Sequence, residues 1–190
     1  RYNMHKNVYR SRYSCGSDEL LKDCLKEINK DMTIISQVTD LGLFFGLSDN
    51  ILDFYQHSAS EESVLINRLK SGESYYFIRE EVFKNRDETP LIDEEVIISH
   101  CRNRSVTTRD IVVRYDVFDM GHKADNFFDS IKVYSDLDIY TSFVPRQQTY
   151  GLMTCPKLEV SMKIYSKVSD PVKNLAISEA VDRYFRDIGR

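Results

Sequence analysis

The spacing of apolar residues changes near residue 90, and this change limits the folds that the chain can adopt. In KLEVSMKIYSKV, residues 157–168, apolar and polar side chains alternate, which is typical of a β-strand with one buried face. Residues 111–117 and 131–143 alternate in the same way. Ahead of residue 86, apolar residues recur every three or four positions, as they do along one face of an α-helix. Because helices precede strands and do not alternate with them, we expect an α+β protein with an antiparallel sheet.

Residues 17–86 are expected to be helical. The signals are side chains that cap a first turn, acids near a helix start and a glycine after a helix end. They predict a helix that Ser17 caps, a short helix from Ser48 or Asp49, a third helix that follows Ser60 and stops at Gly72, and a fourth over residues 73–85. The fourth helix would bury Ile78 and Val82.

A C-terminal helix is predicted after the strands. Asp170 caps it and Pro171 takes its first position. Its apolar stripe consists of Ile177, Val181, Tyr184, Phe185 and Ile188. We expect this stripe to cover the apolar face of the sheet, and the charged face of residues 157–168 to point into solvent.

An acidic, proline-containing segment, residues 86–95, separates the helical part from the sheet. The chain therefore divides into a basic and aromatic arm (1–16), a helical part (17–86), and a sheet with its C-terminal helix (87–190). We expect the last two parts to pack together as one compact domain.

The composition favours an intracellular protein, cytoplasmic or nuclear. The four cysteines form no C-x-x-C pair, and a chain of 190 residues with 42% hydrophobic residues can build a core without disulfides. No apolar run approaches the roughly 18 residues of a membrane helix, so we expect no membrane insertion. The scarcity of alanine favours an AT-rich genome as the source. Because the chain begins with Arg1 rather than Met, we expect an excised domain or a processed product.

The sequence contains no motif that identifies an enzyme or a cofactor. Phosphate-binding loops, the G-x-S-x-G motif and the H-E-x-x-H motif are absent. DMGHKAD spaces Asp119, His122 and Asp125 three residues apart, but the same residue types make a polar turn, the interpretation that we favour. In a strand over 95–101, the neighbours His100 and Cys101 would point to opposite faces and form no dyad. We therefore predict no catalytic residue, metal or cofactor, and lean away from enzymatic activity.

Two arginine-containing segments suggest nucleic-acid binding as an alternative. The opening stretch, RYNMHKNVYRSRYSCGS, places arginines among tyrosines, and residues 102–114 form a second segment. Arginine binds phosphate through its planar fork of donors, and tyrosine stacks on unpaired bases. Because the net charge is −4, nucleic acid would require both segments to share a face without acids. The candidate nucleic-acid-binding residues are Arg10, Arg12, Arg102, Arg104, Arg109 and Arg114.

Clusters of aromatic residues favour a protein-binding role. Consecutive residues of a helix point in different directions, so YYF at 75–77 would leave at least one ring outside the core. The interface candidates are Tyr75, Tyr76, Phe77, Phe127 and Phe128. We expect a non-enzymatic intracellular interaction domain, a subunit or adaptor of a larger assembly that binds a protein partner or a second copy. Nucleic-acid binding through residues 1–12 and 102–114 is the second hypothesis, and an enzyme with an unrecognised site is the third.

Overall fold

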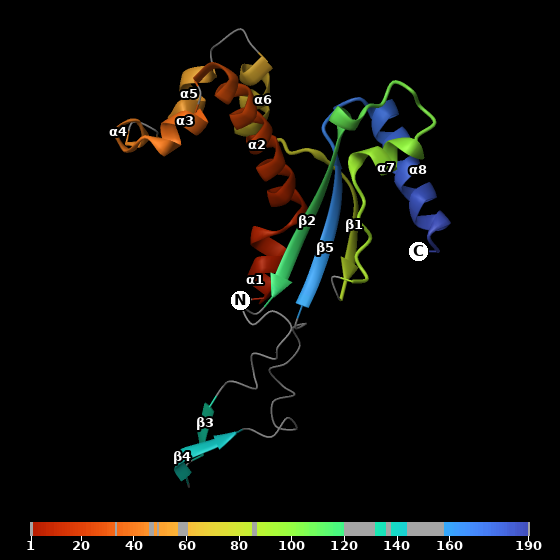
Figure 1. Ribbon diagram of the computed structural model, residues 1–190. Helices are drawn as coiled ribbons and strands as arrows, with labels where there is room; N and C mark the ends of the chain where they lie inside the picture. The colour runs from red at the N-terminus through yellow and green to blue at the C-terminus, as the bar shows by residue number, and fades with distance from the viewer. Residues whose placement is uncertain are drawn as a thin grey trace.

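The computed structural model describes residues 2–32, 34–45, 48, 50–56, 61–84, 87–119, 132–135, 138–143 and 158–189 (Figure 1). Its helices are α1 (Tyr2–Met4), the π-helix η1 (His5–Tyr9), α2 (Arg12–Met32), α3 (Ile34–Thr39), α4 (Leu41–Phe44), α5 (Ile51–Tyr55), α6 (Glu61–Lys70), α7 (Glu94–Ser99), the 3-10 helix η2 (Thr108–Asp110) and α8 (Pro171–Asp187). Its strands are β1 (Tyr76–Phe83), β2 (Ile111–Asp119), β3 (Lys132–Ser135), β4 (Asp138–Phe143) and β5 (Leu158–Ser166). The expected α+β class is confirmed.

The three long strands form an antiparallel sheet in the order β1-β5-β2. β3 and β4 form a separate antiparallel pair. The alternation in residues 157–168 and 111–117 correctly predicted β5 and β2. Residues 131–143, which alternate as one strand would, contain the two strands of the separate pair.

The C-terminal helix covers one face of the sheet, as expected. Asp170 caps it, because the Asp170 carboxylate accepts a hydrogen bond from Val172 N at 2.9 Å. The core between α8, α7 and the sheet consists of Phe83, Ile92, Ile97, Val106, Ile111, Val160, Met162, Ile164, Ile177, Ala180, Val181 and Phe185. Ile188, the last residue of the predicted stripe, lies beyond the end of α8 and is exposed.

The opposite face of the sheet is also covered, which corrects the prediction that it points into solvent. Tyr165 Oη of β5 donates a hydrogen bond to the carbonyl oxygen of Arg12 in α2 at 2.9 Å. Lys163, which was expected on the solvent side, is only 2% exposed. The sheet is therefore a middle layer, with α1, η1 and α2 on one side and α7 and α8 on the other (Figure 1).

The N-terminal residues are helical, and α2 begins at Arg12 rather than at Ser17. The predicted arm, residues 1–16, is therefore α1, η1 and the first turns of α2. Gly16 lies where the backbone of α2 packs closely against the sheet. A Cβ at Gly16 would lie 3.2 Å from the carbonyl oxygen of Tyr75 and 3.2 Å from the ring of Tyr165, so the glycine lets α2 lie close to the sheet.

Two segments differ in type from their predictions. Residues 73–85, predicted as a helix, contain β1, which pairs with β5. A register shift between Phe77 and Arg79 interrupts the alternation of β1, and strand pairing outweighs the helix propensity of its Glu and Arg residues. Residues 95–101, expected within the sheet, include most of α7, whose first turn Asp93 caps.

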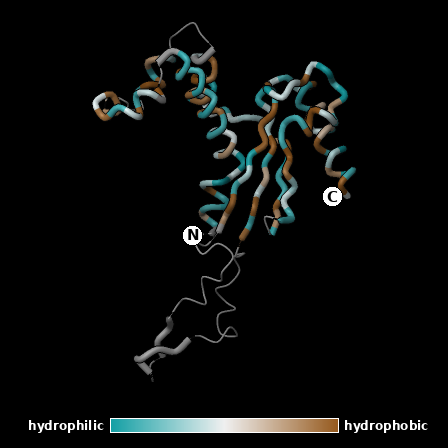
Figure 2. Tube along the Cα trace, in the orientation of Figure 1, coloured by the Kyte–Doolittle hydropathy of each residue, from teal (hydrophilic) through white to brown (hydrophobic). Residues whose placement is uncertain are grey.

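Apolar residues follow the strands of the sheet and recur on the α3–α5 region (Figure 2). β2 and β5 bury or half-bury theirs between two layers of helices, whereas Tyr76 of β1, Val82 of β1, which was predicted to be buried, and several residues on α3, α4 and α5 are exposed. Among the described residues, no helix is long and apolar enough to cross a membrane.

Candidate functional site

A buried charged cluster lies on the face of the sheet that α1, η1 and α2 cover. We call Glu80, Arg114, Asp116, Ser161 and Lys163 the polar cluster. Strand alternation places Ser161 and Lys163 on one face of β5. The register then sets Lys163 opposite Glu80 of β1 and opposite Arg114 of β2. Charged residues from all three strands therefore meet in the middle of the sheet.

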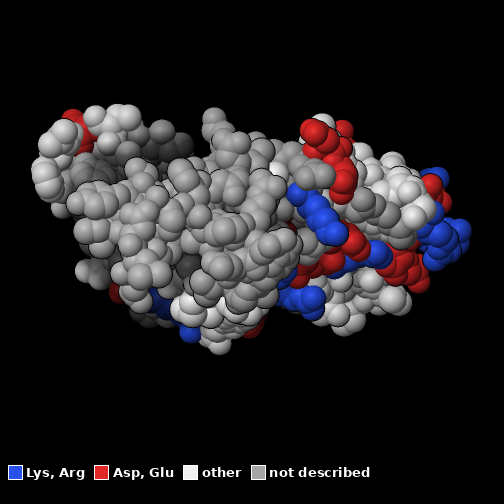
Figure 3. Space-filling model, turned by 90° about the horizontal axis from the view of Figure 1, so that it is seen from below, with Lys and Arg blue, Asp and Glu red and all other residues white. Residues whose placement is uncertain are grey.

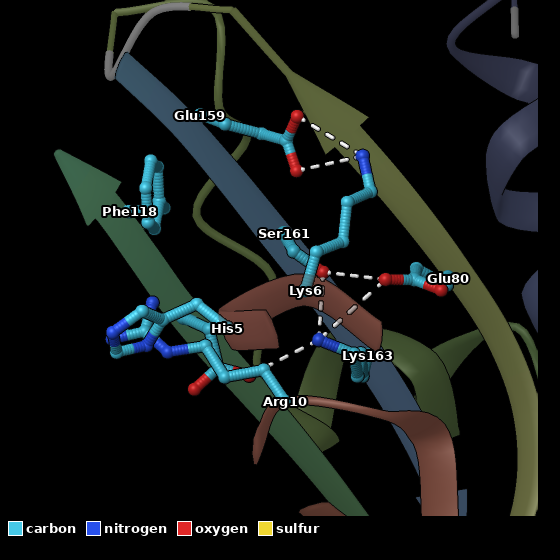
Figure 4. A pocket seen from close by; sticks show the side chains of 9 residues that line it. His5, Lys6, Arg10, Glu80, Phe118, Glu159, Ser161 and Lys163 are labelled. Carbon is cyan, nitrogen blue, oxygen red and sulfur yellow. Dashed lines mark hydrogen bonds and ion pairs between the residues drawn. The ribbon is translucent and has the colours of Figure 1, made fainter. Parts of the chain in front are cut away.

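Lys163 is the centre of the polar cluster (Figure 4). Its Nζ lies 3.1 Å from Asp116 Oδ2 and 3.5 Å from Glu80 Oε1, and donates a hydrogen bond to Ser161 Oγ at 2.9 Å. Ser161 Oγ in turn donates to Glu80 Oε1 at 2.8 Å. A buried ammonium requires such partners, because desolvation of an unpaired charge costs roughly several kcal/mol.

Arg114 connects the polar cluster to α2. Its Nε lies 3.1 Å from Asp116 Oδ1, and its Nη1 lies 3.1 Å from Asp18 Oδ2 and 3.3 Å from Glu19 Oε1. Arg114 Nη1 also donates to the carbonyl oxygen of Cys15. The first turns of α2 are thus held to the sheet by charge pairing as well as by packing.

The basic residues of the polar cluster lower the pKa of its acids. Burial alone would raise the pKa of Asp116, but the adjacent charges of Lys163 and Arg114 outweigh it and hold that pKa below its usual value. Burial also acts to raise the pKa of Glu80, and the hydrogen bond from Ser161 together with the charge of Lys163 lowers it by more. Both carboxylates are therefore ionised at neutral pH.

Cys15 contacts the polar cluster from α2 without the environment of a nucleophile. Its Sγ donates to Asp116 Oδ2 at 3.4 Å. Burial, reinforced by the negative charge of Asp116, raises the pKa of the Cys15 thiol to about 11. The thiol therefore stays protonated at neutral pH, where a reactive cysteine would be a thiolate.

η1 closes the open end of the polar cluster. Lys6 Nζ lies 3.0 Å from Glu159 Oε1, Arg10 donates to a carbonyl oxygen of β2, and the ring of His5 packs 5.9 Å from that of Phe118 (Figure 4). The cavity that remains has a volume of about 20 Å³, which holds about one water molecule. The polar cluster therefore joins the N-terminal helices to the sheet and offers no room for an organic substrate.

The structure separates the arginines that the sequence proposed as one nucleic-acid-binding surface. Arg10 donates to the carbonyl oxygen of Val117 in β2, and Arg114 of β2 pairs with Asp116. Arg12 Nε lies 3.3 Å from Glu80 Oε2. The exposed arginines of the segment before β2 are Arg102, Arg104 and Arg109.

These exposed arginines precede Ile111 at the start of β2, whereas Arg10 contacts Val117 near its end. The rise of a strand places Ile111 and Val117 roughly 20 Å apart. Figure 3 shows acidic and basic side chains interspersed on the described surface seen from below. Arg12 and Arg114 lie against acids of the polar cluster, whereas Arg102, Arg104 and Arg109 lie in the segment before β2.

The predicted aromatic interface residues have different environments. Tyr75 is buried and its Oη donates to Asp23 Oδ2 at 2.7 Å, whereas Phe77 is half-buried with its ring 5.8 Å from that of Tyr165. Tyr76 is exposed on β1. The other two candidates, Phe127 and Phe128, lie outside the described residues.

Six apolar side chains of α3, α5 and α4 with its C-cap are exposed, in a region that the sequence analysis did not select. They are Val38, Leu41, Leu43, Phe44, Phe45 and Phe54, and we call them the α3–α5 surface. Leu41, Phe45 and Phe54 are 75%, 79% and 78% exposed. α3 and α4 extend away from the sheet (Figure 1). The signal that could have found them is the density of Leu and Phe in LGLFFGL between two aspartates.

The histidine and cysteine candidates form no dyad. His100 ends α7, where its Nδ1 lies 2.9 Å from the carbonyl oxygen of Val96. The Cys101 thiol instead faces the carbonyl oxygen of Asn103. No group of three or more potential metal ligands occurs in the part of the chain that the structure describes, and His122 and Asp125 lie outside that part.

Comparison with known proteins assigns no family to this chain. No protein-family model matches its sequence, and no curated protein matches it. Any functional inference therefore depends on the geometry of its own residues.

Proposed function

We propose that this protein is a non-enzymatic intracellular interaction domain, a subunit or adaptor, that binds a protein partner through the α3–α5 surface. The observation that carries this proposal is the exposure of Leu41, Phe45 and Phe54. At about 200 Å² per side chain, the three phenylalanines of this surface expose roughly 400 Å². The valine and two leucines add to the aromatic area, and exposed apolar area of this extent marks binding surfaces.

The charge of the same region indicates what kind of partner would fit. Residues 34–56 contain Asp40, Asp49 and Asp53 but no lysine or arginine. Asp53 pairs with Lys70 of α6, whereas the exposed Asp40 carboxylate accepts hydrogen bonds only from the first turn of α4 among the described residues. A complementary partner would therefore present an apolar surface with lysine or arginine at its rim. Such charges speed the encounter and exclude wrong partners, while the apolar contacts supply most of the affinity.

The polar cluster and the separated arginines support this proposal over the alternatives. The acids and bases of the cluster are paired with one another, and the cavity among them holds about one water. That arrangement favours a structural role for the cluster. The pairing of Arg12 and Arg114 with acids weighs against a basic face that they would share with Arg102, Arg104 and Arg109.

The test compares a double variant, Leu41→Ser with Phe45→Ser, with the control Leu91→Ser, which alters an exposed leucine outside the α3–α5 surface. Light scattering over a concentration series measures self-association, and affinity capture from extracts of the source cells measures partner binding. We expect the wild type and Leu91→Ser to retain the same partner and the double variant to lose it. A protein that stays monomeric and retains nothing, or a double variant that retains the same partner, contradicts the proposal.

Nucleic-acid binding has one observation in its favour, and it remains the second candidate. Arg102, Arg104 and Arg109 are exposed and have no ion-pair partner within the described residues. Fluorescence polarisation with a labelled single-stranded oligonucleotide tests it. This candidate requires binding that weakens steeply between low and moderate salt and drops in Arg102→Ala with Arg104→Ala, and also in Arg10→Ala with Arg12→Ala. Absent or salt-insensitive binding excludes it.

A further inference from the structure

The two outer strands of the sheet differ in how their free edges are covered. On β2, the backbone N–H of Val113 donates to Glu94 Oε1 at 3.0 Å, and the carbonyl oxygen of Val117 accepts from Arg10. Both bonds come from outside the sheet, so α7 and the N-terminal segment cap this edge. Capping an edge in this way prevents another strand from pairing there.

The edge of β1 has no such cover over its first three residues, Tyr76 to Ile78. Within the described residues, the backbone of these three has no hydrogen-bond partner outside the pairing of β1 with β5. An uncovered strand edge presents N–H and C=O groups to which an extended peptide can bind. An additional strand can therefore pair with the sheet at the first three residues of β1.

A groove runs beside this uncovered part of β1. One half has a volume of about 500 Å³ and lies between β1 and α8, where its walls include Tyr76 and Leu175. The other half, also about 500 Å³, continues towards α2 and α6, where its walls include Arg12 and Arg68. The two halves share Tyr76 and Asn174. A strand edge with a helix across a groove provides both backbone pairing and side-chain pockets.

We propose that an extended segment of a partner protein binds this groove as a fourth strand that pairs with β1. Its backbone pairs with residues Tyr76 to Ile78, and an apolar side chain enters the space between Tyr76 and Leu175. The Oδ1 atom of Asn174 is buried and accepts no hydrogen bond within the described residues. If the Asn174 amide rotates, its Oδ1 atom can face the backbone of the bound segment, where an N–H group can donate a hydrogen bond to it.

The charge of the groove indicates an acidic residue in the ligand. Arg12 and Arg68 line the end of the groove near α2, where Arg68 Nε already lies 3.1 Å from Glu73 Oε2 and Arg12 is the arginine that faces the ligand. The Arg12 side chain is largely exposed and its Nε lies 3.3 Å from Glu80 Oε2, so the other N–H groups of its guanidinium can donate to a second carboxylate. The expected ligand is therefore an extended segment with alternating apolar residues and an acid at one end.

The experiment selects phage-displayed random ten-residue peptides on the full-length chain and measures the best peptide by fluorescence polarisation. We expect an apolar residue and an acid in the consensus. Leu175→Glu should weaken binding about tenfold or more, the loss of one apolar anchor. The matched control is Val172→Glu, an exposed apolar residue of the same helix that does not line the groove. Arg12→Gln should remove the preference for the acid.

Two further measurements separate strand pairing from other modes of binding. Methylation of the peptide nitrogens one at a time should weaken binding at alternate positions only, because an added strand pairs at every second residue. Binding should also slow hydrogen exchange in Tyr76 to Ile78. The proposal is wrong if no peptide is enriched, if Leu175→Glu binds as tightly as the wild type, or if exchange in β1 does not change. Phe45→Ser should leave peptide binding intact, so the groove and the α3–α5 surface can fail independently.

Discussion

The two faces of the central sheet are both buried, but only the face towards α8 is apolar throughout its core, whereas the face towards α2 combines the polar cluster with a second apolar cluster that includes Leu20, Ile28 and Tyr165. Towards α8, β5 presents Val160, Met162 and Ile164, which pack in an apolar core. Towards α2, it presents Ser161 and Lys163, which belong to the polar cluster. Burial on the first face removes apolar area from water, whereas burial on the second requires every charge to have a partner.

This difference teaches what each layer of helices contributes. An apolar face tolerates side chains of similar volume, because dispersion contacts have little directional preference. A face that buries Lys163, Asp116 and Glu80 tolerates only the arrangement in which ammonium and carboxylates meet. We therefore expect the apolar contacts of α8 and of α2 to supply most of the stability, and the polar cluster to define where α1, η1 and α2 sit on the sheet.

The largest effect is expected from Lys163→Met. The substitution leaves the buried carboxylate of Asp116 and the half-buried carboxylate of Glu80 without their ammonium partner. Removal of one member of a buried pair typically costs roughly 3–5 kcal/mol. Urea unfolding followed by circular dichroism measures this loss as a shift of the transition midpoint.

The control on the other face is Met162→Leu, which conserves volume at the adjacent position of β5 and should cost less than about 1.5 kcal/mol. The double variant Lys163→Met with Asp116→Asn should lose less than the sum of its single variants, because the two groups interact. A Lys163→Met protein as stable as Met162→Leu would remove the distinction between the faces.

Acid is expected to weaken the polar face and leave the apolar face unchanged. Asp116 and Glu80 have folded pKa values below their ordinary values of 3.8 and 4.5. Each therefore stabilises the fold above its ordinary value, and loses that contribution as the pH falls through the folded value. Asp116→Asn removes one such group, so its free energy of unfolding should fall less steeply than that of the wild type below about pH 4.

Urea unfolding at a series of pH values measures these slopes. Met162→Leu should keep the slope of the wild type, because it leaves every titrating group in place. Asp23, whose pKa is also lowered although burial alone would raise it, contributes equally to all three proteins. Parallel curves for Asp116→Asn and the wild type would show that the polar cluster does not produce the acid sensitivity.

Local signals predicted the elements of this fold well where one short stretch decides the structure. Asp170 and Pro171 start α8, Gly72 follows α6 with a φ of +79°, and alternation locates β5. The polar cluster was missed because a lysine on a strand face ordinarily points into water. Its burial depends on acids of other strands, one of them 47 residues away in the chain, and on α2 above them. β1 was missed because its pairing with β5 lies outside any local window.

The smallest effect is expected from Lys6→Ala, which breaks an ion pair at the rim of the same polar face. Lys6 Nζ lies 3.0 Å from Glu159 Oε1, as close as Lys163 lies to Asp116, but the Lys6 side chain remains partly in water. Exposed pairs typically contribute roughly 0.2–1 kcal/mol, and salt screens them. Urea unfolding at low and at high salt should therefore show a small loss at low salt that shrinks at high salt. Because the two pairs have nearly equal geometry, a loss in Lys6→Ala as large as that in Lys163→Met would mean that burial does not set the strength of this face.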